Sequence, residues 1–189
     1  NSPLRCYYCK QELFSRLKEI AAARSIRFVL DGANKDDRAD YRPGAKAGRE
    51  LGIRSPLREA GLTKQEIRLL SRVFGLPTWD KPSLACLASR FPYRTAIDRE
   101  TLVQVGKAEE ALRKLGLTQL RVRHHGDIAR VEIRPEEFRK IMVSRARARV
   151  VRGLKKAGYN YVTLDLEGYR TGSLNEPLRL KREKGQRGF

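Results

Sequence analysis

Three cysteines are the residues of this chain whose types and spacing are best suited to chemistry. Cys6 and Cys9 form a Cys-x-x-Cys pair, and Cys86 lies far along the chain. The spacing of the pair is typical of zinc sites, redox pairs and iron–sulfur clusters alike. A structural zinc site takes four protein ligands, which would require His124 or His125, whereas three thiolates suit a cubane cluster with one open iron. The residues alone leave a cluster, a zinc site and inert buried thiols as alternatives.

The neighbourhood of Cys86 differs from that of the pair. It lies in "WDKPSLACLASRFPYR", a stretch that combines prolines with cations. The positive charges of Lys81, Arg90 and Arg94 would favour the thiolate, which is the nucleophilic form of cysteine. The alternative is a buried structural cysteine, and the local sequence does not choose between the two.

Length and composition predict a globular protein. With 189 residues, of which 40% are hydrophobic, the chain can bury one solid core, or one core and a smaller second one. No run approaches the roughly 18 consecutive apolar residues of a membrane helix. The first residues also lack the regions of a signal peptide. We therefore expect a cytoplasmic protein without a membrane partner.

The charge balance is strongly basic. The chain has 41 Lys and Arg against 22 Asp and Glu, a net charge of +19. Such an excess attracts phosphorylated partners without identifying them. Aromatic residues make up 7% of the chain and do not alternate with basic ones, so no base-stacking platform is indicated. A basic surface that is merely solvated explains the excess equally well.

The first half of the chain predicts an α/β layer. Periodic apolar residues predict a helix over Lys10–Arg24, and "IRFVLDGAN" predicts a buried strand over Arg27–Leu30. A short helix over Ala45–Leu51 is expected to follow. Thr63-x-x-Glu66 has the pattern of a capping box at the start of another helix.

The second half predicts a smaller domain. Asp98 is expected to cap a helix, and "LRVRHHGDIARVEIR" predicts two strands joined by a tight turn. After Pro135, apolar residues at steps of four from Phe138 to Leu154 predict one helix, and "YVTLDLEGY" predicts a last strand. The order α-β-β-α-β indicates a small α+β domain. A basic stripe on the last helix consists of Arg145, Arg149, Arg152 and Lys156.

Several strings together resemble one family. They are "RCYYCK", "LDGANKDD", "YRPG", "GLPTWDKPSLACLASRFPY", "VRHHGDIARVE" and "YVTLDLEGYRTGSLNE". In this order they resemble the LarE family of ATP-dependent sulfur transferases, over nearly the whole chain from Asn1 to about Glu176. The resemblance implies part of an α/β PP-loop domain, the adenine nucleotide α-hydrolase fold, over residues 1–95. A small α+β domain over 96–176 and a basic disordered tail over 177–189 would follow.

The family makes the nickel-pincer nucleotide cofactor of lactate racemase. The resemblance implies that ATP and Mg²⁺ adenylate a carboxylate of a pyridinium dicarboxylate mononucleotide, whose activated oxygen is then replaced by sulfur. Some members sacrifice one cysteine sulfur, and others use a [4Fe-4S] cluster on three cysteines. Cys6, Cys9 and Cys86 match the cluster type, and Cys86 matches the position of the sacrificial cysteine.

The resemblance also implies roles for residues around the phosphorylated substrate. Ser89 and Arg90 follow Cys86 within one turn and would orient the substrate. Arg121 and Arg123 alternate on a predicted strand, so their side chains face one side and would clamp the substrate phosphate. Without the family, two solvated strand arginines are an equal alternative. A phosphorylated small molecule is therefore the expected partner, ahead of nucleic acid.

Nucleotide binding is expected to be incomplete in this chain. Asp31 and Asn34 end the first predicted strand, where α/β folds place ligands, and resemble the nucleotide-proximal loop of the family. The PP-loop itself, Ser-Gly-Gly-x-Asp-Ser, is expected upstream of Asn1. We expect the 189 residues alone to be inactive and the longer protein to be the enzyme. The family also implies a homo-oligomer, such as a hexamer.

Two other functions remain open from the sequence. A related PP-loop enzyme of tRNA thiolation would use the same three cysteines and a basic surface for RNA. A basic module that binds zinc through Cys6 and Cys9 and nucleic acid through its last helix would not be an enzyme. The "HHGDIARVE" and "DLEGYR" strings favour the sulfur transferase, because they match its second domain.

Overall fold

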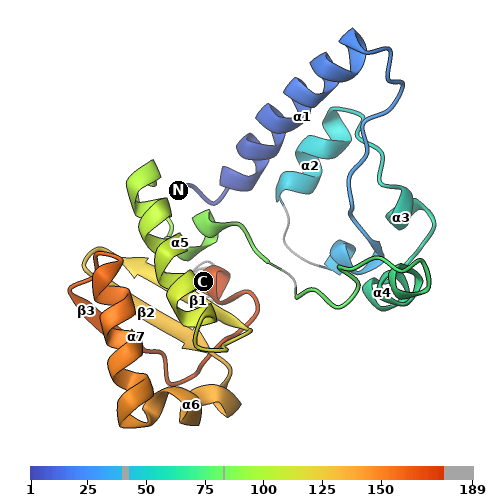
Figure 1. The fold of residues 1–189 in the computed structure, drawn as a ribbon. Helices are drawn as coiled ribbons and strands as arrows, with labels where there is room; N and C mark the ends of the chain where they lie inside the picture. The colour runs from blue at the N-terminus through green and yellow to red at the C-terminus, as the bar shows by residue number, and fades with distance from the viewer. Residues whose placement is uncertain (40–42, 83, 177–189) are drawn as a thin grey trace, which may run out of the picture. The chain divides into compact units, whose positions relative to one another are not determined.

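The chain folds into two compact units. A computed structural model describes residues 1–39, 43–82 and 84–176 (Figure 1). One unit comprises residues 2–83, and the other comprises Asn1 together with the chain from Leu84 onward. The Cys86 loop therefore belongs to the second unit. The tail predicted over 177–189 lies outside the described residues. None of the described helices is both long and apolar enough to cross a bilayer.

The first unit is built from helices. They are α1 (Arg5–Ala23), α2 (Pro43–Glu50), α3 (Pro56–Glu59) and α4 (Lys64–Val73), with a 3₁₀ turn η1 over Lys35–Ala39. α1 packs against α2, and Phe14 and Ala47 are buried. α1 begins five residues before the predicted Lys10. The prediction missed this start because the first residues of the helix lack the apolar periodicity of the rest. Cys6 and Cys9 therefore lie within the helix.

The prediction of a buried strand over Arg27–Leu30 was wrong. The segment forms one isolated parallel bridge, Leu30 with Arg54, supported by the Arg54 N–H donating to the Val29 carbonyl at 3.1 Å. Phe28 and Leu30 are exposed. A strand buries its side chains only when neighbours cover both its faces, and the described residues of this unit supply a single bridging partner.

Local end signals in this unit are confirmed. The Thr63 hydroxyl accepts from the Glu66 N–H and the Glu66 carboxylate accepts from the Thr63 N–H, which closes the predicted capping box at the start of α4. Gly52 and Gly75 follow α2 and α4 with φ near +68°. That left-handed conformation ends helices and favours glycine.

The second unit packs helices on a three-stranded sheet, so the mixed α/β class is confirmed. Its helices are α5 (Arg99–Arg113), α6 (Phe138–Met142) and α7 (Ser144–Lys156), and its strands are β1 (Leu120–His125), β2 (Ile128–Ile133) and β3 (Tyr161–Leu164). β1 pairs with β2 antiparallel across the predicted turn, and β3 pairs with β2 in parallel. The Asp98 carboxylate accepts from the Thr101 N–H and caps α5, as predicted.

The two faces of the sheet differ in character. α5 and α7 cover one face, where the core lies (Figure 1). The main members of this core are Ala108, Leu112, Val122, Val131, Ile133, Val150, Leu154 and Tyr159. Because side chains alternate along a strand, Arg121, Arg123 and Glu132 face the other side. A charged side of the sheet is thus built directly beneath an apolar core.

The single helix predicted from Phe138 to Leu154 is wrong. The chain leaves the helix at Val143, whose backbone is extended (φ −67°, ψ 139°), and α7 begins at Ser144. Val150 and Leu154 are buried as predicted, but Met142 is exposed. A step of four recurs in both segments, so apolar spacing alone did not reveal the break between them.

Candidate functional site

Cys86 lies at the surface immediately before a single 3₁₀ turn, η2 (Leu87–Arg90). The Ser89 N–H donates to the Cys86 carbonyl at 2.9 Å and closes this turn. The following residue, Phe91, is fully buried. Asn1 binds the chain beyond it, because its side-chain amide donates to the Phe91 carbonyl at 2.8 Å. The thiol is thus exposed at the start of a turn, and the backbone after that turn is held by the burial of Phe91 and by Asn1.

Arg90 connects the Cys86 turn to α5. It is buried and forms a two-point ion pair with the fully buried Glu109 of α5, at 2.6 Å and 3.2 Å. Its remaining nitrogen donates to the Ser89 hydroxyl at 2.8 Å and to the Cys86 carbonyl at 3.4 Å. Glu109 also accepts from the Val122 N–H at 3.2 Å. The pair therefore joins the Cys86 turn to α5 and β1.

Arg123 makes a second buried ion pair under the same turn. Its guanidinium donates to both oxygens of Glu132, at 2.8 Å and 3.0 Å. It also donates to the Ser173 hydroxyl at 2.6 Å and to the Ser89 carbonyl at 2.7 Å. Ser89 is consequently held by Arg90 through its side chain and by Arg123 through its main chain. Arg90 and Arg123, two of the three arginines predicted to touch substrate, therefore bind groups of the protein itself.

Arg121 differs from these two arginines. It is half-buried and donates to the Tyr169 hydroxyl at 2.8 Å and to the Arg170 carbonyl at 3.1 Å, and its guanidinium lies over the Tyr169 ring. In the described part of the chain no carboxylate forms an ion pair with it. Burial lowers the pKa of Arg121, and the neighbouring charges of Arg123 and Arg90 lower it further. An anion bound here would form the ion pair that Arg121 lacks among the described residues.

The two histidines point to opposite sides of β1, as expected from strand alternation. His124 is buried between Phe91 and Tyr159, and its Nδ1 lies 3.1 Å from the Tyr159 hydroxyl. His125 is exposed. Burial lowers the pKa of His124 and raises the pKa of Tyr159 to about 12. His124 therefore serves packing and hydrogen bonding.

His124 should make the second unit sensitive to acid. Its pKa is lowered in the folded state, so between that value and the ordinary 6.5 the unfolded chain binds more protons. Stability is complete above this window and is lost as the pH falls through it. We expect the urea concentration at half-unfolding to decrease when the pH is lowered from about 7.5 to about 5.5. The decrease should be smaller in His124→Gln. An equal fall in wild type and variant would contradict this assignment.

Cys6 and Cys9 lie in the first unit on the first turns of α1. Both thiols are exposed, and their i, i+3 spacing puts them on neighbouring positions of one helix face. The Arg5 guanidinium lies 3.8 Å from Cys6 Sγ. Within residues 1–39, 43–82 and 84–176, no three His, Cys, Asp or Glu side chains gather into a metal-binding group. The three-cysteine cluster stays a prediction.

Asp31 and Asn34 form a polar turn in the first unit. Asp31 follows the single bridge and accepts from the Ala33 N–H and from the buried Ser55 hydroxyl at 2.6 Å. The Asn34 side chain accepts from the Asp36 N–H at 3.0 Å. Asp36 in turn accepts from the Lys64 N–H at the start of α4. The two predicted nucleotide contacts are thus held in one preformed turn.

Comparison with known proteins places the chain in a family. No protein-family model matches it. An uncharacterized protein of Synechocystis is 47% identical over 94% of the chain and 66% of its own length. The pyridinium-3,5-bisthiocarboxylic acid mononucleotide synthase of Lactiplantibacillus plantarum is 44% identical over 94% of the chain and 64% of its own length. The chain belongs to the LarE family.

The match covers most of this chain but only part of each relative. An uncharacterized protein of Methanocaldococcus jannaschii is 30% identical over 90% of the chain and 66% of its own length. The chain therefore spans slightly less than two thirds of the length of these relatives. Its similarity to them runs through both units, because 178 of its residues align with the first two.

Membership in the LarE family connects residues that the fold brings together. Ser89, Arg90, Arg121 and Arg123 all lie in the second unit, the first two in the η2 turn after Cys86 and the other two on β1. Cys6, Cys9, Asp31 and Asn34 lie in the first unit, which the structure describes separately. The fold thus gathers the residues predicted for substrate, and the roles of all of them stay predictions.

Sequence reasoning missed the partners of the arginines. Neither Glu109 nor Glu132 was predicted as the partner of an arginine. A signal for Glu109 was present, because it falls on the apolar face of α5 with Val105 and Leu112, where an unpaired carboxylate would be costly. Tyr169 and Ser173 gave no comparable signal.

Proposed function

We propose that this chain is the substrate- and sulfur-handling part of an ATP-dependent sulfur transferase. The substrate would be a pyridinium dicarboxylate mononucleotide, whose carboxylate is adenylated with release of pyrophosphate and then converted to a thiocarboxylate. The observation that carries the proposal is 44% identity over 94% of the chain to the synthase of Lactiplantibacillus plantarum. The exposed Cys86 thiol supports it, as does Arg121 of the same unit, which has no ion-pair partner among the described residues.

Cys86 is the group that would handle sulfur. It is exposed, and its turn is fixed by two buried ion pairs, Arg90 with Glu109 and Arg123 with Glu132. Such anchoring holds a nucleophile in place without relying on contacts that bound substrate would have to supply. Arg90 and Arg123 are positioning residues in this account, because their guanidiniums bind carboxylates and the turn.

Arg121 is the residue that would receive the substrate phosphate. Its guanidinium presents several donors in a plane, which suits a phosphate, and it has no ion-pair partner within the described residues. We expect Arg121→Ala to raise KM for the mononucleotide about tenfold to a hundredfold, the range of a charged hydrogen bond, with a smaller change in kcat. Arg121→Lys should recover part of the loss. Arg99→Ala, an exposed cation on α5, is the matched control and should leave KM unchanged.

A [4Fe-4S] cluster on Cys6, Cys9 and Cys86 is compatible with the donor set, since all three thiols are exposed. Such a cluster would supply an open iron that carries sulfide. The chain's own contribution would be two thiolates from one helix face and a third from the anchored turn. ATP with Mg²⁺ would bind near Asp31 and Asn34 and through residues of the longer protein.

The cluster is tested by anaerobic reconstitution with iron and sulfide, followed by optical and EPR spectra. Under the proposal, wild type shows a cubane-type signal, and Cys6→Ala, Cys9→Ala and Cys86→Ala each lose it. Zinc binding without iron or sulfide would support a zinc module instead. No cluster in a folded sample would leave sacrifice of the Cys86 sulfur as the sulfur source.

The substrate is tested by pyrophosphate release. Full-length protein is incubated with ATP and Mg²⁺ and with either the mononucleotide or unmodified tRNA. The proposal predicts release that depends on the mononucleotide. Release that depends on tRNA, with binding that weakens steeply with salt, would overturn it in favour of a tRNA thiolation enzyme.

A further inference from the structure

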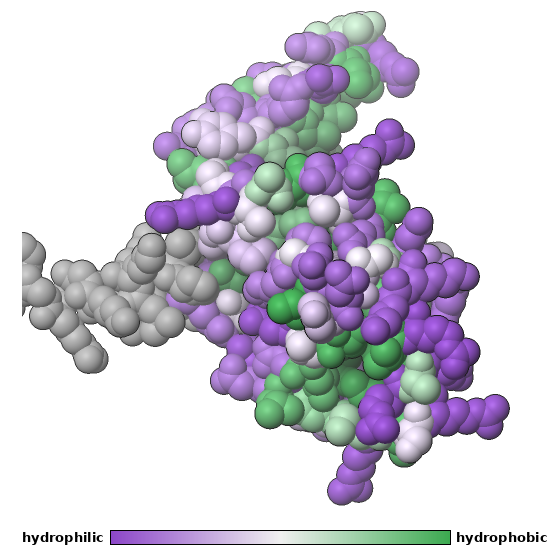
Figure 2. Space-filling model, turned by 90° about the vertical axis from the view of Figure 1, so that its left-hand side faces the viewer, coloured by the Kyte–Doolittle hydropathy of each residue, from purple (hydrophilic) through white to green (hydrophobic). Residues whose placement is uncertain are grey.

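The outer side of α7 is a strongly basic surface outside the site described above. The helix carries no acidic residue. Its exposed cations are Arg145, Arg147, Arg149, Arg152, Lys155 and Lys156. None of them forms an ion pair with a carboxylate in the described ranges, in contrast to Arg130 and Arg170, which both pair with Asp165. Hydrophilic side chains predominate on the face shown in Figure 2, and hydrophobic ones reach the surface between them.

This arrangement is unfavourable for the helix itself. Arg145 and Arg149 are like charges at i, i+4, as are Arg152 and Lys156, and such pairs destabilise a helix. Arg145 and Arg147 also lie in the first turn, where the helix dipole favours anions, and no acidic residue is present there. An anionic partner would relieve both effects. A surface that is merely soluble does not require cations at these positions.

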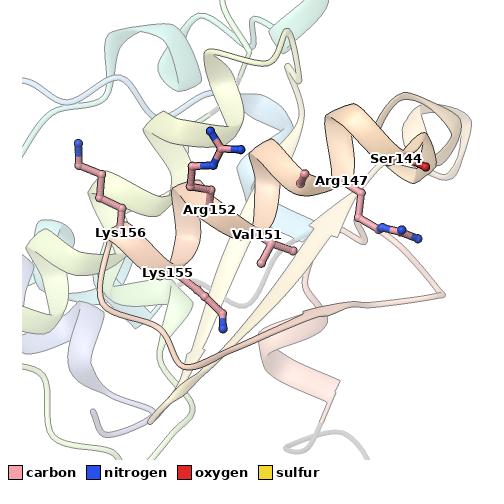
Figure 3. A pocket seen from close by; sticks show the side chains of 7 residues that line it. Ser144, Arg147, Val151, Arg152, Lys155 and Lys156 are labelled. Carbon is pink, nitrogen blue, oxygen red and sulfur yellow. The ribbon is translucent and has the colours of Figure 1, made fainter.

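The basic surface surrounds an apolar groove. A shallow groove of about 660 Å³, largely open to solvent, follows α7, and the residues that line it all belong to this helix: Ser144, Arg147, Ala148, Val151, Arg152, Lys155 and Lys156. Figure 3 shows Arg147, Val151 and Lys155 projecting to one side of the helix, and Arg152 and Lys156 to the other. Val151 is half-buried but lies outside the core, to which α7 contributes Val150 and Leu154. The groove therefore has an apolar floor between cationic edges.

We propose that this surface docks an acidic amphipathic helix of a partner protein. Arg147 and Lys155 are eight residues apart, so carboxylates at matching steps of four on a facing helix can pair with both. An apolar side chain between those carboxylates would cover Ala148 and Val151. An apolar centre with a charged rim is the pattern of protein interfaces. The groove lining includes no aromatic side chain on which nucleic-acid bases would stack.

The test measures binding of a labelled synthetic helical peptide, with Glu at steps of four and Leu on the same face, to full-length protein by fluorescence anisotropy. We expect Arg147→Glu/Lys155→Glu to weaken binding at least about tenfold. Val151→Ser should also weaken it. Arg99→Glu/Lys107→Glu removes the same charge from exposed positions of α5 and should have little effect. A peptide with Gln in place of Glu should not bind.

Each other outcome overturns the proposal. Equal loss in the α5 and α7 double variants would show attraction by net charge alone. α7 would be a nucleic-acid surface if an oligonucleotide bound more tightly than the peptide. In that case Arg147→Glu/Lys155→Glu would abolish oligonucleotide binding, and Val151→Ser would leave it unchanged. No binding of the acidic peptide at moderate salt would remove the docking site. Circular dichroism of every variant checks that α7 is retained.

Discussion

Cys86→Ala should abolish thiocarboxylate formation in the full-length protein while pyrophosphate release continues. The thiol is exposed at the head of the η2 turn, and both proposed sulfur sources, a cluster or the cysteine sulfur itself, need it. Loss of a covalent or ligating group of this kind costs at least about a thousandfold in rate. Adenylation involves other residues, so substrate-dependent pyrophosphate release should stay within about threefold of wild type. Both products are measured in one reaction.

The controls for this prediction separate chemistry from folding. Cys86→Ser keeps the shape of the side chain and should be equally inactive. Ala85→Ser changes the neighbouring exposed residue and should retain activity. Thiocarboxylate formation by Cys86→Ala at a rate near that of wild type would show that sulfur does not pass through this residue.

Glu109→Ala should be the most destabilising of the substitutions considered. Glu109 is fully buried, and its loss leaves the buried Arg90 charge without its carboxylate partner and the Val122 N–H without its Glu109 acceptor. Breaking a buried ion pair by removing one member costs about 3–5 kcal/mol. We expect urea unfolding followed by circular dichroism to show a loss of this size. Thiol alkylation should also show a more mobile Cys86.

Glu110 provides the matched control. It is the next residue on α5, is paired with Lys114 at 2.7 Å, and is 59% exposed. Exposed pairs of this kind contribute at most about 1 kcal/mol, so Glu110→Ala should unfold nearly like wild type. Similar losses in the two variants would show that the Glu109 network does not hold the unit together.

Local signals predicted much of this fold. Three features depend only on residues a few positions apart and could therefore be predicted from the local sequence. They are the capping box at Thr63, the cap at Asp98 and the Gly126 turn. The predicted burial of Arg27–Leu30 was wrong, because burial of a strand depends on which strands lie beside it and not on its own residues. The break at Val143 was hidden because the same apolar step occurs on both sides of it.

The site was only partly predicted, again because some of its features depend on distant parts of the chain. The family resemblance located Ser89, Arg90, Arg121 and Arg123, and the fold gathers them in one unit. Their different roles depend on partners far away in the chain, since Arg90 meets Glu109 on another element and Arg123 meets Ser173 fifty residues on. Only the contacts distinguish two arginines that anchor a turn from one, Arg121, that is available to an anion.

The most direct test of the central claim is the mass of the product of one turnover. Full-length protein, prepared without oxygen, is mixed with ATP, Mg²⁺ and the pyridinium dicarboxylate mononucleotide, and the mononucleotide is recovered for mass spectrometry. The account predicts a product in which one carboxylate oxygen has been exchanged for sulfur. Recovery of unchanged mononucleotide, from protein that has released pyrophosphate in its presence, would contradict it.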